Sequence, residues 1–170
     1  VWNKLVARSL YIDSKIRFPE GYSMGEDMTM IKLLTQAKSV GHVVKPLYHY
    51  IRTNSSAMTQ IYSSSHLQQL LKNTTDVCNF LHNQIVDNSI EREINWFKLN
   101  VKLPFLFSER LPDMLLWQQW FPESNCYIMS NHMQALRTRI LQWTAAHNLL
   151  FVNRTYNTLV FKFIYGIIYK

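Results

Sequence analysis

The chain has 170 residues, of which 48% are hydrophobic and 14% aromatic, so it can bury a core and does not have the composition of a disordered segment. Its four glycines and five prolines are too few for the many tight turns of an all-β fold. The net charge of +7 predicts attraction to an anionic partner, but it does not choose between nucleic acid, phosphates and a membrane surface.

The first 60 residues alternate between helical and extended patterns. We expect a short helix within residues 2–13 and a second helix over 27–39, which Gly41 would end. The β-branched and aromatic run over 43–50 predicts a strand, and Pro46 predicts that this strand is interrupted or lies at an edge. These residues therefore resemble the end of an α/β domain with too few strands for a sheet of its own.

After residue 60 the apolar residues recur at helical spacing. Because aromatic stripes with this spacing are usually core, we expect a helical bundle. Its predicted helices begin near Ser64 or Ser65, near Ser89, between Pro112 and Pro122, near Met133 and near Tyr156. The predicted fold is mainly α, with a small α/β part in residues 1–60 and a helical region in 61–170.

The two cysteines, Cys78 and Cys126, lie in apolar or aromatic sequence surroundings. Neither has another cysteine nearby at the spacing of metal ligands. We therefore predict two buried thiols, and neither a disulfide nor a zinc site.

Two adjacent acids, Glu26 and Asp27, stand where the second helix is expected to begin. Ser23 and Glu26 have the spacing of a capping box, and Asp27 fits as an N-cap in a slightly later register. Spacing alone favours a helix start. A carboxylate at such a loop-to-helix junction can also face a crevice and accept a proton from an attacking hydroxyl.

A second cluster follows the predicted strand. In an extended segment successive side chains alternate between two faces, which places His49 and Arg52 on opposite faces. Ser55 and Ser56 follow shortly after. A surface edge strand running into a turn explains this pattern, and so does a loop that binds phosphate through a guanidinium and hydroxyls. The third cluster, Trp2-Asn3-Lys4, indicates nothing by itself.

Taken together, the clusters WNKL, IRFPEG, GEDM and KPLYHYIRTNSSAMT follow an order and spacing that resembles bacterial family 2 glycosyltransferases of the GT-A fold. The resemblance covers residues 2–60. It implies that residues 1–60 are the C-terminal part of a GT-A catalytic domain and that 61–170 are a helical C-terminal region. Members of this family transfer a sugar, with inversion, from a nucleotide-diphosphate donor to an acceptor hydroxyl during polysaccharide and cell-envelope glycan synthesis.

The resemblance also implies roles for single residues. Asp27 matches the general base and Glu26 its acidic neighbour. Arg52 matches the arginine of a loop that closes over the donor diphosphate, and His49 is the candidate for a histidine that approaches the metal or the diphosphate. The remaining donor-binding candidates are Ser55, Ser56, Trp2, Asn3 and Lys4.

The chain departs from the family in lacking the D-x-D motif that binds the divalent cation. No two of its aspartates have that spacing. We therefore expect the C-terminal portion of a transferase, inactive by itself, with Mg²⁺ or Mn²⁺ required by the full-length enzyme and no metal bound to this segment.

The resemblance further implies a nucleotide-sugar donor and a glycan or lipid-linked acceptor as partners. It implies a cytoplasmic location, with peripheral contact at the inner face of the membrane through residues 156–170, where Lys162 and Lys170 accompany an apolar run. Nucleic acid is not expected because the basic residues are scattered singly, while self-association is an open expectation. The alternative is a noncatalytic helical interaction module with a basic surface.

Overall fold

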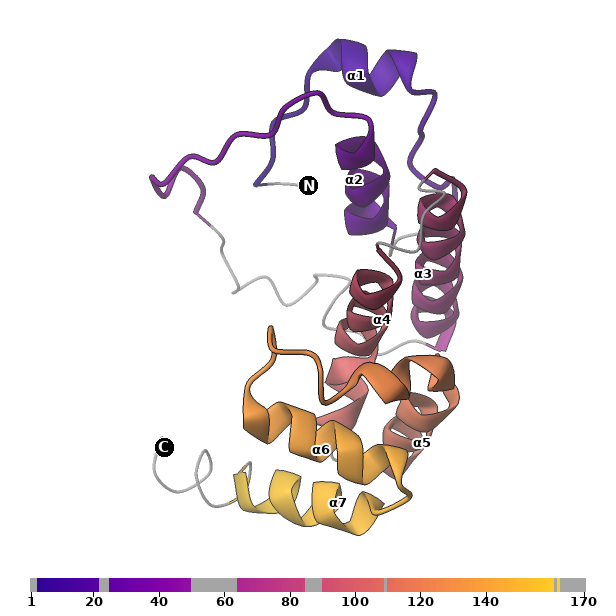
Figure 1. Cartoon of the computed structure of the whole chain (residues 1–170), viewed down its shortest axis with the longest axis vertical. Helices are drawn as coiled ribbons and strands as arrows, with labels where there is room; N and C mark the ends of the chain where they lie inside the picture. Colours follow the sequence, from indigo (N-terminus) through magenta and orange to yellow (C-terminus); the bar gives the residue numbers. More distant parts are fainter. Residues whose placement is uncertain are drawn as a thin grey trace. The chain divides into compact units, whose positions relative to one another are not determined.

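The structure is a computed structural model that describes residues 3–21, 25–49, 64–84, 90–108, 110–160 and 162 (Figure 1). All regular structure in these residues is helical. The chain divides into two compact units, Val1–Val86 and Asp87–Lys170. Each unit is described separately below.

The first unit holds three helices: α1 spans Arg8–Asp13, α2 spans Glu26–Thr35 and α3 spans Ser64–Gln84. Helix α3 begins at a serine, as its sequence predicts, and buries Val77 and Cys78. Helix α2 buries Met30 and Leu33 and packs against α3. It ends four residues before the predicted end at 39, because the chain turns at Gln36 and does not continue the helical hydrogen bonding.

The predicted α/β part is wrong for the residues that the structure describes. Residues 43–49 form no strand, and no sheet occurs anywhere in the described ranges. Val43, Val44 and Leu47 are 63%, 87% and 78% exposed. A strand is stabilised by main-chain hydrogen bonds to a neighbouring strand, and Pro46 supplies no donor for them, so β-branched residues alone do not produce one here.

The second unit is a bundle around α4, which spans Glu91–Leu106. Helices α5 (Leu111–Gln119) and α6 (Leu136–Ala146) contact α4, and so does η3, a 3₁₀ helix over Pro122–Tyr127. Helix α7 (Leu150–Thr158) packs on α6. The core of this unit includes Ile94, Leu99, Leu106, Met114, Trp117, Ile128 and Ala145.

One boundary differs from the sequence-based prediction. Pro104 lies inside α4, which continues to Leu106 although the missing proline N–H removes one helical hydrogen bond. Helix α7 already begins at Leu150, before the predicted helix start near Tyr156, and most of that predicted helix lies outside the described residues. The sequence of the first turn of α7, Leu-Phe-Val-Asn, carries no signal of a helix start. Asn148, which has a left-handed conformation (φ 62°), separates this turn from α6.

The prediction for the cysteines is confirmed for one residue only. Cys78 is buried in α3, whereas Cys126 is exposed in η3. The Cys126 Sγ lies 3.2 Å from the Glu123 carbonyl oxygen. A surface 3₁₀ turn exposes a side chain that its aromatic sequence neighbours would suggest is buried.

Candidate functional site

The acidic pair lies in the first turn of α2. Gly25 is the N-cap residue of α2, a position that differs from both predicted caps, Ser23 and Asp27, and Ser23 itself lies outside the described residues. Glu26 and Asp27 are exposed, whereas the next three residues of the helix are buried. The free main-chain N–H groups of a first turn stabilise negative charge. Two solvent-facing carboxylates at such an end can accept protons from an approaching hydroxyl group.

The start of α2 is held by close packing around Gly25. A Cβ atom at this position would lie 2.4 Å from Pro19 Cγ and 3.1 Å from Asn73 Nδ2, so only glycine fits without displacement. The Gly25 carbonyl oxygen accepts from Thr29 N and from Thr29 Oγ1, both at 2.9 Å. The proline of FPEG and the glycine of GED are therefore spatial neighbours, and together they determine where the acidic pair begins.

Asn73 of α3 is the residue of this site that the sequence did not indicate. It is 7% exposed, and its Nδ2 has no hydrogen-bond partner among the described residues. A buried donor without a partner costs about 1–3 kcal/mol. The sequence around Asn73 does not predict this role, because its contact with Gly25 joins residues 48 positions apart. That contact exists only once the two helices have packed.

Helices α2 and α3 run parallel, as their contacts show. Gly25 lies against Asn73, Lys32 pairs with Asp76, and Gln36 Nε2 donates to Gln84 Oε1 at 3.2 Å. The contacts therefore advance in the same direction along both helices. The first turns of α3, over 64–72, extend about 13 Å beyond Asn73 at 1.5 Å per residue, past the start of α2.

The remaining predicted site residues are only partly described. Lys4 Nζ donates to Asn3 Oδ1 at 2.7 Å, and both residues are exposed. His49 is exposed in the non-helical segment after α2. The predictions for Trp2, Arg52, Ser55 and Ser56 fall outside the described residues.

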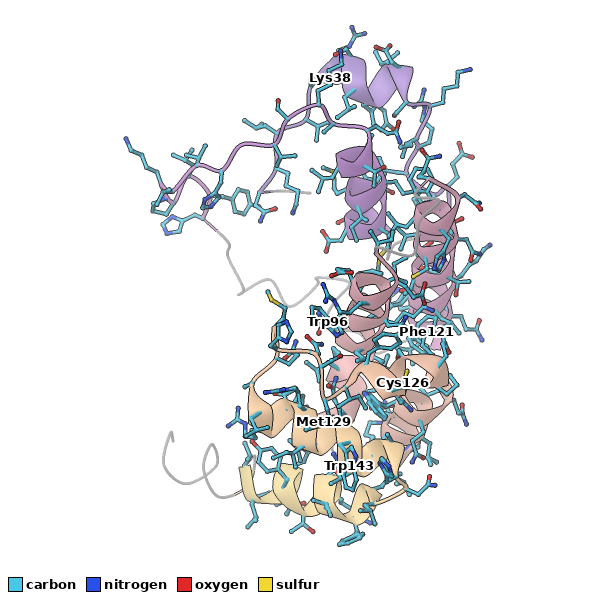
Figure 2. The ribbon with its side chains drawn as sticks, in the orientation of Figure 1. Lys38, Trp96, Phe121, Cys126, Met129 and Trp143 are labelled. Atoms are coloured by element: carbon cyan, nitrogen blue, oxygen red, sulfur yellow. The ribbon has the colours of Figure 1, made fainter. Side chains whose placement is uncertain are left out.

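A cleft of about 640 Å³ lies between α1, the C-terminal half of α2 and residues 38–41. Its walls are mostly apolar and also carry Asp13 and Lys38, the second of which is labelled in Figure 2. None of the predicted site residues that the structure describes lines it. This cleft is thus separate from the acidic pair.

The described residues contain no group of three or more histidines, cysteines and acids that could hold a metal ion. The divalent cation that the resemblance implies stays an expectation. Among the same residues, no helix is both long enough and apolar enough to cross a membrane.

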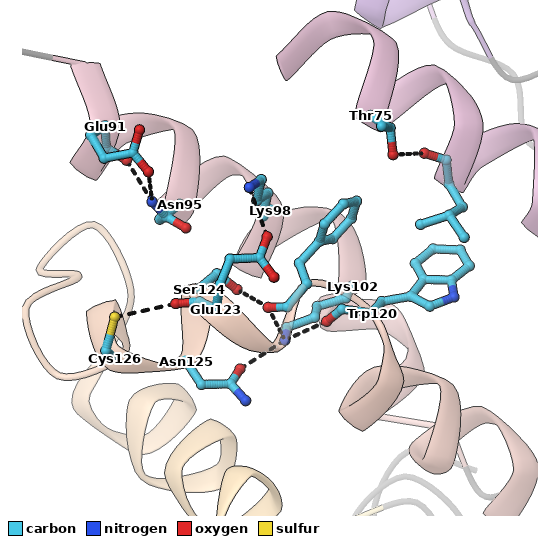
Figure 3. A network of polar contacts seen from close by, with 12 residues as sticks. Thr75, Glu91, Asn95, Lys98, Lys102, Trp120, Glu123, Ser124, Asn125 and Cys126 are labelled. Carbon is cyan, nitrogen blue, oxygen red and sulfur yellow. Dashed lines mark hydrogen bonds and ion pairs between the residues drawn. The ribbon is translucent and has the colours of Figure 1, made fainter. Parts of the chain in front are cut away.

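The second unit contains a buried lysine that the sequence-based prediction missed. Lys102 of α4 is fully buried, and its ammonium group donates to Trp120 O at 2.9 Å, Phe121 O at 3.3 Å and Asn125 Oδ1 at 2.8 Å (Figure 3). The same nitrogen lies 4.1 Å from the centre of the Trp117 ring. All three donors are used, which is the condition for burying a lysine at tolerable cost.

Two influences on the pKa of Lys102 act in opposite directions. Burial lowers its pKa to about 7, and the nearby Glu123 carboxylate acts in the opposite direction. Burial also raises the pKa of Glu123, but the hydrogen bond from Lys98 at 2.8 Å, a main-chain hydrogen bond and the charges of Lys98 and Lys102 together lower that pKa. Phe121, whose carbonyl accepts from Lys102, is left-handed with φ 47° and ψ 54°. The lysine therefore holds a strained link between α5 and η3.

No protein-family model matches the chain, and comparisons with curated proteins and with solved structures also return no match.

Proposed function

We propose that this chain is the C-terminal segment of an inverting glycosyltransferase that transfers a sugar from a nucleotide-diphosphate donor to a glycan or lipid-linked acceptor hydroxyl. The observation that carries the proposal is the position of Glu26 and Asp27. The motif that resembles the family's catalytic GED is exposed to solvent at a helix N-terminus. This is where an acceptor hydroxyl can reach a carboxylate.

In this proposal Asp27 removes the proton from the acceptor oxygen as that oxygen attacks the anomeric carbon. A general base contributes about 10²–10⁴-fold to such a step. Glu26 is its acidic neighbour, and the packing of Pro19 and Asn73 around Gly25 keeps the helix start in one place. A bound divalent cation would supply charge stabilisation for the leaving diphosphate. The residues proposed to act beside it are Arg52 and His49.

The test is nucleoside-diphosphate release by the full-length polypeptide to which this chain belongs, measured with a panel of nucleotide sugars and acceptor extracts. Asp27→Asn is expected to reduce transfer by at least about 100-fold while donor affinity stays nearly unchanged. Asp13→Asn, which changes an exposed carboxylate on α1, is the matched control and should keep full activity. Transfer that survives Asp27→Asn would remove Asp27 as the base.

A second candidate function is a noncatalytic helical interaction module with a basic surface. The specific observation in its favour is that all regular structure in the described residues is helical, together with an exposed apolar face on α6. Absence of sugar transfer by the full-length polypeptide with every donor tested would favour this second candidate over the transferase.

A further inference from the structure

Helix α6 presents its apolar side to solvent. Leu136, Ile140 and Trp143 are 56%, 47% and 42% exposed. Their spacing of four and three residues places them within about 60° of one another around the helix. We call these three residues the α6 apolar face. The expectation that this stripe would be core is wrong.

The opposite side of α6 is buried although it is largely polar. Its buried residues are Thr138, Leu141, Gln142, Thr144 and Ala145. Three hydrogen bonds hold this side in the unit: Gln142 Nε2 donates to Leu99 O at 3.5 Å, Thr144 Oγ1 to Asn153 Oδ1 at 3.1 Å, and Asn153 Nδ2 to Leu141 O at 2.8 Å. Rolling the helix over would break these buried bonds, so the outward orientation of the apolar side is built into the fold.

Large apolar side chains in the segment before α6 and on α7 are also exposed. Met133, just before the helix, is 76% exposed, and Phe151 of α7 is 67% exposed. The ring of Trp143 stacks on His147 with centroids 4.1 Å apart, and His147 Nδ1 lies 2.8 Å from the Trp143 carbonyl oxygen. Figure 2 labels Trp143 on α6. A partly exposed tryptophan supported by a polar ring is typical of side chains at membrane–water interfaces.

The charge of this part of the chain has one sign. The sequence contains no aspartate or glutamate from Ser124 to Lys170, but it holds five basic residues there, Arg137, Arg139, Arg154, Lys162 and Lys170. Arg137 and Arg154 are exposed on α6 and α7. The last acid before this stretch, Glu123, is already paired with Lys98 at 2.8 Å. This stretch therefore offers an anionic surface basic side chains and no carboxylate of its own.

We propose that the α6 apolar face binds an anionic lipid surface, with α6 lying in the membrane interface. The apolar side chains enter the boundary between headgroups and acyl chains, and the flanking arginines meet the lipid phosphates. Nucleic acid would leave Leu136 and Ile140 without an apolar environment. A typical protein partner would bring charges of both signs, and this stretch carries no carboxylate to pair with basic ones. The proposal is independent of any catalytic activity.

The experiment is flotation of the whole chain with vesicles of phosphatidylcholine alone or mixed with phosphatidylglycerol. Binding is expected to the mixed vesicles and to fall steeply as salt is raised. The double variant Ile140→Asn/Trp143→Asn should lose at least about 90% of the binding, because the apolar contribution is removed. Arg137→Gln alone should weaken binding about fivefold.

Leu115→Asn is the matched control. Leu115 lies on α5 and is 42% exposed, like Trp143, so it tests whether any exposed apolar residue suffices. It should bind as the wild type does, and circular dichroism should show unchanged helix content in all variants. Brominated lipids should quench tryptophan fluorescence in the wild type and much less in Trp143→Phe.

Equal binding by the double variant and the wild type would overturn the proposal. So would a wild type that binds neither kind of vesicle. If the wild type binds no vesicles but self-associates in sedimentation velocity, and the double variant does not self-associate, the α6 apolar face is instead a contact between copies of this chain.

Discussion

Replacing Lys102 by methionine tests the buried ammonium group of the second unit. The two side chains have similar volume, so the substitution removes the charge and three donors with little change in packing. The oxygens that lose the lysine donor belong to Trp120, Phe121 and Asn125, and the Phe121 carbonyl keeps its hydrogen bonds from Ser124 N and Ser124 Oγ. Loss of the buried charge and loss of the hydrogen bonds change the free energy of unfolding in opposite directions, so its value at one pH is not informative. The quantity to measure is therefore the pH dependence of the free energy of unfolding.

The sign follows from the lowered pKa. Below pH 7 Lys102 is protonated in both the folded and the unfolded chain and contributes no slope. Between about 7 and 10.5 the unfolded chain keeps a proton that the folded chain has lost, so the free energy of unfolding rises with pH. At about 1.4 kcal/mol per pKa unit, the gain between pH 6 and pH 9 is about 2–3 kcal/mol.

The assay is urea denaturation at several pH values, followed by tryptophan fluorescence. Four of the five tryptophans, at positions 96, 117, 120 and 143, belong to the second unit and report on it. The wild type should gain stability from pH 6 to pH 9 relative to Lys102→Met. Lys98→Met, on the same helix, should keep the wild-type slope. Identical slopes for the wild type and Lys102→Met would refute the reasoning that burial lowers the lysine pKa.

Three further predictions concern packing and exposure. Gly25→Ala should lower the free energy of unfolding of the first unit by about 1–3 kcal/mol in denaturation experiments. Gly41→Ala, which places nothing within 4 Å of the new Cβ, should change that free energy little. Equal effects of the two variants would contradict the close packing at the start of α2. A maleimide reagent should modify Cys126 rapidly and Cys78 only on unfolding. Mass spectrometry that finds both cysteines labelled in the native chain would contradict the burial of Cys78 in α3. Leu99→Ala should cost about 2–5 kcal/mol because this side chain is fully buried; a smaller loss would mean that the surrounding helices collapse into the cavity.

The acidic pair illustrates how far the sequence could predict the candidate site. The pattern around Gly25 indicated a helix start, and α2 does begin at Glu26 with Asp27 in its first turn. The residue that caps the helix and the one that packs against it were not predictable. Gly25 replaces the expected serine cap, and Asn73 reaches it from another helix. Capping competes with tertiary packing, and packing depends on residues far away in the sequence.

The sequence by itself determined that the regular structure of the described residues from 64 onward is helical, because the spacing of apolar residues along α3, α4 and α6 is a local property of the chain. Only the tertiary structure decided which side of each helix is covered. In α6 the apolar stripe faces solvent and Gln142 is buried, and in α4 the core receives Lys102. The physical reason is that burial depends on whether a polar side chain finds hydrogen-bond partners on neighbouring helices, and those partners exist only once the helices have packed.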